Sequence, residues 1–190
     1  MIKKILSNYT PKILFIAGYK FFVFYIYYSF KNLKKIIISK NLESLNRCFN
    51  QISLNFKKNK FFFDIKKIDL LSEENNSFGL IREIYFRDVY LRFFKFENPK
   101  NINCVDIGCN IGMFSVLASK IFKDVKSIDM NIKYIEPYKR IMSDNFINNA
   151  QFFNYFVGSE HLLVEKNQDI KALDFNKFIN KEKLKNIFLK

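Results

Sequence analysis

One stretch near the middle of the chain constrains the fold more than any other. Residues 102–107 form an apolar run typical of a buried strand, and residues 113–122 carry apolar side chains at helical spacing. Between them the chain reads Asp106-x-Gly108-x-Asn110-x-Gly112. Glycine lacks a Cβ, so the backbone can turn sharply and a ligand can approach it closely. The start of a helix also offers unpaired N–H groups. The pattern therefore predicts a strand–turn–helix junction suited to a polar ligand.

The segments that follow extend this unit. Residues 125–129 predict a second strand ending in Asp129, residues 133–146 a helix, and residues 151–157 a third strand; residues 187–190 begin a fourth. Such alternation favours an α/β protein with a parallel, doubly wound, Rossmann-like sheet. An acid at the tip of the second strand is placed to accept hydrogen bonds from ribose hydroxyls.

The spacing within the turn narrows the class of ligand. The dinucleotide fingerprint is G-x-G-x-x-G, whereas this chain has G-x-N-x-G. The anionic Asp106 would oppose a pyrophosphate, but it suits the cationic amino and sulfonium end of S-adenosylmethionine. A nicotinamide-dependent dehydrogenase is therefore the weaker enzyme alternative.

Residues 105–115 closely resemble the first motif of the FkbM-type methyltransferases. The resemblance covers roughly residues 79–190. Its further matching segments are residues 82–90, 127–131, 156–159 and 172–175, with the run from there to Lys190. Two positions depart from the family pattern, since Cys109 replaces the usual Ala and Met130 replaces the usual Pro.

The resemblance implies the cofactor S-adenosyl-L-methionine and methylation of a hydroxyl on a saccharide or secondary metabolite. It leaves the catalytic residues unknown, and we expect no metal. Carried onto this chain, it gives the turn residues Gly108, Asn110 and Gly112, with Cys109 among them, around the methionine moiety. Asp106 would hold the amino-acid end of the cofactor, directly or through water. The remaining assignments are Asp129 for the ribose hydroxyls, and Met130 and Val157 for the adenine walls.

Charge is distributed unevenly along the chain. Residues 1–67 hold 14 Lys and Arg against two acids, and residues 68–190 hold 18 against 16. A basic arm on a near-neutral domain favours an anionic surface. Residues 13–30 form an apolar, aromatic stretch that contains Lys20; it fits a helix in the membrane interface, a helix packed on the protein's own core, or a span, which the central lysine disfavours. We expect a cytoplasmic protein with peripheral membrane contact through residues 1–40, and nucleic acid as the less favoured partner.

The sequence patterns predict a basic helical arm at 1–50 and a strand over 61–65. The family resemblance implies a lead-in segment at 51–100 and a partial methyltransferase domain at 101–190. In the family this chain resembles, further strands follow the fourth, so we expect a fragment. The alternative is a non-catalytic membrane- or RNA-binding protein acting through the arm. Three cysteines without CxxC spacing and the single His161, expected in a surface loop, exclude a disulfide scaffold and a Cys/His zinc site.

Overall fold

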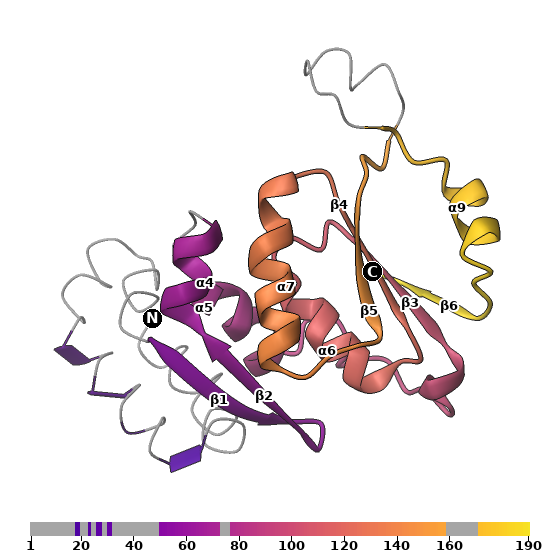
Figure 1. The fold of residues 1–190 in the computed structure, drawn as a ribbon. Coiled ribbons are helices and arrows are strands. Elements are labelled where there is room, and N and C mark those ends of the chain that lie inside the picture. Colours follow the sequence, from indigo (N-terminus) through magenta and orange to yellow (C-terminus); the bar gives the residue numbers. More distant parts are fainter. Residues whose placement is uncertain are drawn as a thin grey trace. The chain divides into compact units, whose positions relative to one another are not determined.

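The computed structural model describes residues 50–72, 77–158 and 171–190, together with residues 18, 19, 23, 26, 27, 30 and 31. The chain divides into two compact units, Met1–Phe93 and Phe94–Lys190, which are described separately below (Figure 1). His161 and most of the expected basic arm lie outside the described residues.

The described part of the first unit is built on a β-hairpin. Strands β1 (Gln51–Phe56) and β2 (Asn59–Asp64) pair antiparallel, and alternate side chains of both strands are buried. The strand expected over 61–65 is confirmed up to Asp64. Ile65 instead begins helix α4 (Ile65–Ser72), because its buried side chain belongs to the face of the helix that packs inward.

Helical structure continues after α4. Helix α5 (Ser77–Ile81) leads into a π-helical turn, η1 (Arg82–Phe86), a region where the sequence pattern alone did not separate helix from strand. The ring of Tyr85 is fully buried and meets three phenylalanine rings edge-on at centroid distances of 5.0 to 5.7 Å. These rings belong to Phe56, Phe61 and Phe63 of the hairpin. Aromatic packing thus joins the helical turn to the hairpin.

The second unit contains a parallel sheet. Its four strands lie in the order β5-β4-β3-β6, and every neighbouring pair is parallel. The prediction of a Rossmann-like α/β fold is therefore confirmed. In chain order the elements are η2 (Pro99–Asn101), β3 (Asn103–Ile107), α6 (Met113–Ile121), β4 (Val125–Asp129), η3 (Ile132–Tyr134), α7 (Ile135–Asp144), β5 (Ala150–Asn154), α9 (Phe175–Lys181) and β6 (Ile187–Leu189).

Two boundaries differ from the expected ones. The third strand stops at Asn154 instead of residue 157, because Phe156 leaves the sheet and forms an isolated bridge with Ala172. The helix expected over 133–146 is split into η3 and α7, and the side chain of Asn131 begins this region by accepting a hydrogen bond from the Lys133 N–H.

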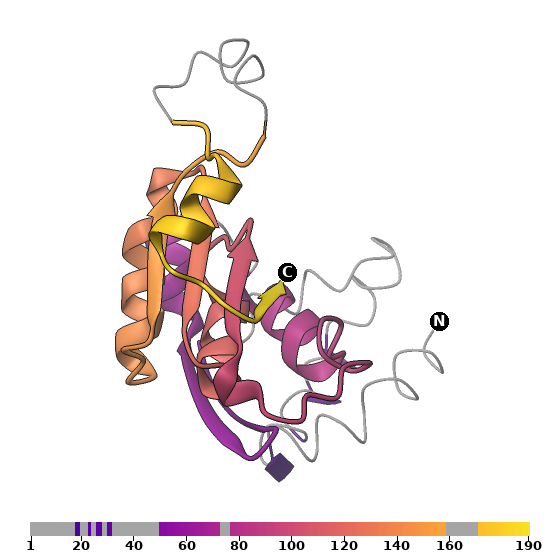
Figure 2. The same ribbon diagram turned by 90° about the vertical axis from the view of Figure 1, so that its right-hand side faces the viewer.

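Helices cover both faces of this sheet. Helices α6 and α7 lie on one face and α9 lies on the other, as Figure 1 and the view from the α9 side in Figure 2 show. Val105 and Ile128 point toward α9 and pack with Phe178. Because side chains alternate along a strand, Asp106 and Ser127 point toward α6 and α7.

The order of the strands includes a position where the chain reverses direction across the sheet. After β3 the chain proceeds outward through β4 and β5, and then β6 returns to the other side of β3. In open α/β sheets ligands bind outside the carboxyl ends of the strands at such a position. The glycine turn follows β3 there. Among the described residues, no helix has both the length and the apolar content needed to cross a bilayer.

Candidate binding site at the carboxyl ends of the sheet

The turn after β3 has a left-handed backbone at three positions. The φ angles are +67° at Gly108, +52° at Asn110 and +85° at Gly112. Residues with a Cβ rarely adopt this conformation, and asparagine is among the few that tolerate it. Here the Asn110 side-chain oxygen accepts a hydrogen bond from the Ile111 N–H at 2.6 Å. The local backbone therefore explains why the sequence has the spacing G-x-N-x-G.

The two glycines of the turn have different surroundings. A Cβ built on Gly108 would meet no atom within 4 Å, so the space beside this residue is open. A Cβ on Gly112 would lie 2.5 Å from Cδ2 of Tyr138 and 3.0 Å from Cε of Met142. Gly108 thus leaves room for a ligand, whereas Gly112 is buried and permits α6 and α7 to pack closely. The structure thus gives Gly112 a packing role, and its expected place beside the methionine moiety stays a prediction.

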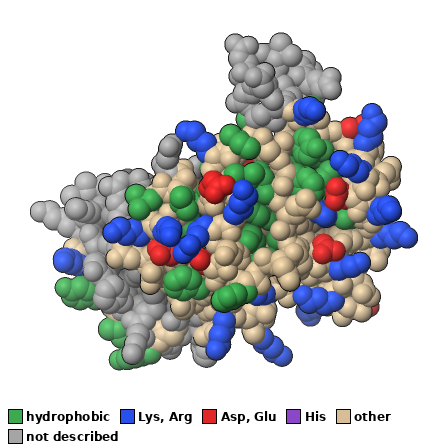
Figure 3. All heavy atoms as spheres, viewed as in Figure 1, with side chains coloured by type: hydrophobic (Ala, Val, Ile, Leu, Met, Phe, Trp, Pro, Cys, Tyr) green, Lys and Arg blue, Asp and Glu red, His purple; other side chains and the backbone are tan. Residues whose placement is uncertain are grey.

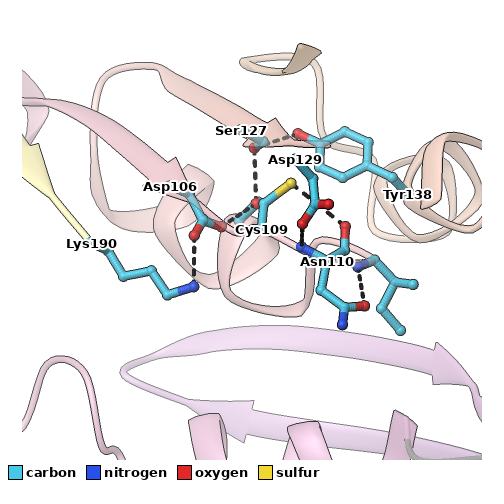
Figure 4. A network of polar contacts seen from close by, with 9 residues as sticks. Asp106, Cys109, Asn110, Ser127, Asp129, Tyr138 and Lys190 are labelled. Carbon is cyan, nitrogen blue, oxygen red and sulfur yellow. Dashed lines mark hydrogen bonds and ion pairs between the residues drawn. The ribbon is translucent and has the colours of Figure 1, made fainter. Parts of the chain in front are cut away.

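Asp129 ties the turn to the end of β4. Its Oδ2 accepts a hydrogen bond from the Asn110 N–H at 2.8 Å, and its Oδ1 accepts one from the Asn131 N–H at 2.9 Å (Figure 4). The side-chain amide of Asn154 donates to the carbonyls of Asp129 and Met130. The carboxylate is only partly buried. Since a carboxylate has about four lone-pair positions, Asp129 retains capacity for further donors.

Asp106 is engaged inside the protein. Its side chain is fully buried; Oδ2 accepts a hydrogen bond from the Ser115 hydroxyl at 2.6 Å, and Oδ1 forms an ion pair with Nζ of Lys190 at 2.9 Å (Figure 4). Burial raises the pKa of Asp106, while Lys190 and Ser115 act in the opposite direction. The Asp106 side chain has no exposed surface in this structure and is held by these two buried partners. Its expected contact with the amino-acid end of the cofactor, directly or through water, stays a prediction.

The Asp106 carboxylate ends a chain of buried hydroxyls. Ser127 donates to Ser115 at 2.9 Å, and the oxygens of Ser127 and Tyr138 are also 2.9 Å apart. Because a serine has one proton to donate, the Tyr138 hydroxyl is the donor to Ser127. Burial raises the pKa of Tyr138, which keeps this hydroxyl protonated. The chain of hydrogen bonds joins α7, β4, α6 and β3, and Lys190 extends it to the end of β6.

Sequence reasoning did not assign several members of this arrangement: Ser115, Ser127, Tyr138, Asn154 and Lys190. One signal was present, since Ser127 is a polar residue at a buried position of an otherwise well-formed strand. A buried hydroxyl requires a partner, and that requirement predicts a polar network without naming its members. The ion pair with Lys190 depends on the pairing of β6 with β3 and leaves no local signal.

The other expected site residues lie at the same edge of the sheet. Met130 follows β4 and is partly exposed, and Val157, which is 36% exposed, follows β5. Cys109 is buried within the turn, and burial raises the pKa of its thiol, as expected for an unreactive side chain. In residues 50–72, 77–158, 171–190 and the few described before them, no cluster of His, Cys, Asp and Glu could hold a metal ion.

The described second unit is thus an α/β protein with a Rossmann-like fold and an open turn at the carboxyl ends of its strands. No family model matches the chain, and no curated protein matches it. Among solved structures, one match is a proposed transferase from Pyrococcus horikoshii, with 13% sequence identity and a TM-score of 0.33. The alignment covers 65% of this chain and 49% of that chain, so this chain spans about half of its length. A likeness of this degree carries no argument about function.

Proposed function

We propose that this chain is the cofactor-binding part of an S-adenosylmethionine-dependent methyltransferase of the FkbM type. Its acceptor is a hydroxyl on a saccharide or secondary metabolite, as the sequence resemblance implies. The observation that carries the proposal is the open space beside Gly108, next to the fixed carboxylate of Asp129, at the point where the strand order reverses.

The residues of the site fit this cofactor better than a dinucleotide. The backbone beside Gly108 is open to close approach, and Asp129 has acceptor positions left for the two ribose hydroxyls. Asp129 supplies a carboxylate at this edge that favours a cationic sulfonium and amino group over a pyrophosphate. The Lys190 ammonium does not reverse this preference, because Asp106 already pairs with it.

In this proposal the described residues bind the cofactor and orient it. When bound, the cofactor supplies an activated methyl group on a sulfonium. In the proposed site, the backbone at Gly108 would lie against the cofactor and Asp129 would fix its ribose, which sets the direction in which the methyl group points. The Asn110 N–H holds the carboxylate for that task. Positioning of this kind lowers the barrier to an in-line transfer. We assign no described residue as the base that takes the proton of the acceptor.

Calorimetric titration with S-adenosylhomocysteine tests the proposal. Replacing Asp129 by Ala removes one or two charge-assisted hydrogen bonds to the ribose, so we expect binding to weaken by roughly 10- to 100-fold. The matched control is Asp174→Ala, which also removes a carboxylate that accepts a backbone N–H, that of Lys177, at 3.0 Å at the start of α9. The Asp174→Ala control should bind S-adenosylhomocysteine with the same affinity as the original protein. Unchanged binding in folded Asp129→Ala protein would contradict the assignment.

A further inference from the structure

Helix α4 of the first unit has an exposed face that its packing does not explain. Its buried face consists of Ile65, Ile68 and Ser72. The opposite face carries the exposed side chains of Lys66, Lys67, Leu70 and Leu71, of which Leu70 is 72% and Leu71 is 39% exposed. At 100° per residue these four side chains lie within about 140° of one another. Two lysines and two leucines therefore share one solvent-facing surface.

The charge of this surface is not neutralised within the helix. The acid of α4, Asp69, accepts a hydrogen bond from the Ser77 N–H through its Oδ1 at 3.2 Å, so it is directed toward α5. Asp64, just before the helix, accepts the Lys67 N–H at 3.1 Å. Within the part of the chain that the structure describes, no ion pair involves the ammonium groups of Lys66 and Lys67, and both side chains are exposed. Figure 3 shows that hydrophobic and basic side chains lie next to one another on the face of the molecule seen in Figure 1.

The described residues before the hairpin also combine exposed apolar side chains with an exposed lysine. Tyr19, Val23, Tyr27 and Phe30 are helical and 71%, 45%, 58% and 64% exposed. Their spacing places them within an arc of about 80° on a helix, and the exposed Lys31 follows at its margin. A row of exposed aromatic and aliphatic side chains beside a lysine is the composition of helices that lie in a membrane interface.

We propose that α4 and this row of residues bind the surface of an anionic phospholipid bilayer. The leucines and aromatic rings would lie at the boundary between headgroups and acyl chains, with the lysines at the anionic headgroups. Residues 1–67 carry 14 basic residues against two acidic ones, which complements such a surface. A nucleic acid would use the lysines and stack on aromatic rings, but it gives no reason for exposed leucines.

Flotation of the full chain with lipid vesicles tests the proposal. Vesicles of phosphatidylcholine containing roughly one-third phosphatidylserine should bind the protein, and pure phosphatidylcholine vesicles should bind it much more weakly. A lysine near such a surface contributes enough for about a fivefold change in affinity, so Lys66→Gln with Lys67→Gln should weaken binding by about 25-fold. Leu70→Asn with Leu71→Asn should weaken it by at least about tenfold. Binding of the original chain should fall at high salt.

Matched controls lie in the second unit. Lys123→Gln with Lys185→Gln removes the same charge, and Phe146→Asn removes a side chain that is 91% exposed. Both controls should change vesicle binding by less than about twofold. Absence of binding to the anionic vesicles, or controls as harmful as the α4 variants, would overturn the proposal. The proposal would also be overturned if the α4 lysine variant lost binding to single-stranded RNA while the α4 leucine variant bound both RNA and vesicles like the original chain. Far-UV circular dichroism checks that each variant is folded.

Discussion

The contrast between Gly108 and Gly112 gives a prediction that can be worked out from the structure. Both residues have positive φ, so an alanine at either position costs about 1–2 kcal/mol in backbone strain. At Gly108 no packing cost is added to this backbone strain, because the new Cβ meets no atom within 4 Å. Gly108→Ala should therefore lower the free energy of unfolding by about 1–2 kcal/mol and no more.

At Gly112 the alanine Cβ would lie 2.5 Å and 2.8 Å from Cδ2 and Cε2 of the Tyr138 ring. The ring is only 2% exposed, and its hydroxyl bonds to Ser127, so it cannot move away freely. Overpacking of this kind costs about 1–3 kcal/mol beyond the backbone strain. We expect Gly112→Ala to lower the free energy of unfolding by about 2–5 kcal/mol in total.

Urea unfolding followed by circular dichroism measures both variants. The midpoint should fall further for Gly112→Ala than for Gly108→Ala, with the slope of the transition unchanged. In a Tyr138→Ala background, where every side-chain atom beyond Cβ is gone, Gly112→Ala should cost little more than the backbone part, since the two sites are in contact. Equal midpoint shifts for the two glycine variants, or a Gly112→Ala cost that Tyr138→Ala does not reduce, would refute the reasoning.

The remaining predictions concern the buried ion pair of Asp106 with Lys190 and the N-cap of α9, Asp174. Lys190→Met leaves the Asp106 carboxylate buried without its cation, so urea unfolding should show a loss of about 3–5 kcal/mol. Burial raises the pKa of Asp106 above 3.8, so the folded state binds this proton more tightly than the unfolded state. The stability of the original chain should therefore fall relative to Asp106→Asn as pH rises from 3.8 through the raised pKa; a constant difference would contradict this. The hydrogen bond from the Lys177 N–H lowers the pKa of Asp174 below 3.8. The stability that the Asp174 carboxylate gives to α9 should therefore be fully present above pH 3.8 and be lost as pH falls through the lowered pKa. Thermal melts of the original chain and of Asp174→Ala, compared over this pH range, measure the difference.

The parallel sheet was predictable because its signals are local. Strand β3 is an apolar run followed by Gly108, β4 ends in the acid Asp129, and the helices between the strands show helical spacing. The turn after β3 could also be placed, since only a few residue types adopt positive φ. The overextended third strand shows the limit of such reasoning. Phe156 pairs with Ala172, a partner that a local pattern does not contain.

The candidate site was predictable in part for the same reason. Asp129 lies at a strand end, as its position in the sequence indicated, and its carboxylate contacts the turn. The partners of Asp106 were not predictable, because Lys190 reaches it only through the pairing of β6 with β3. The packing role of Gly112 depends on Tyr138, which lies on another helix. Contacts between elements decide which of the two glycines has open space beside it.

The most direct test of the account is a map of where S-adenosylhomocysteine binds, read from backbone amide chemical shifts of the isotope-labelled chain. We predict that the largest changes fall on the amides of residues 108–111 and 129–131, and that an equal concentration of NAD leaves these amides much less affected. Saturable binding with shifts confined to these two segments would support a cofactor site at the open turn. Shifts located elsewhere, or no change at these amides, would contradict the central claim.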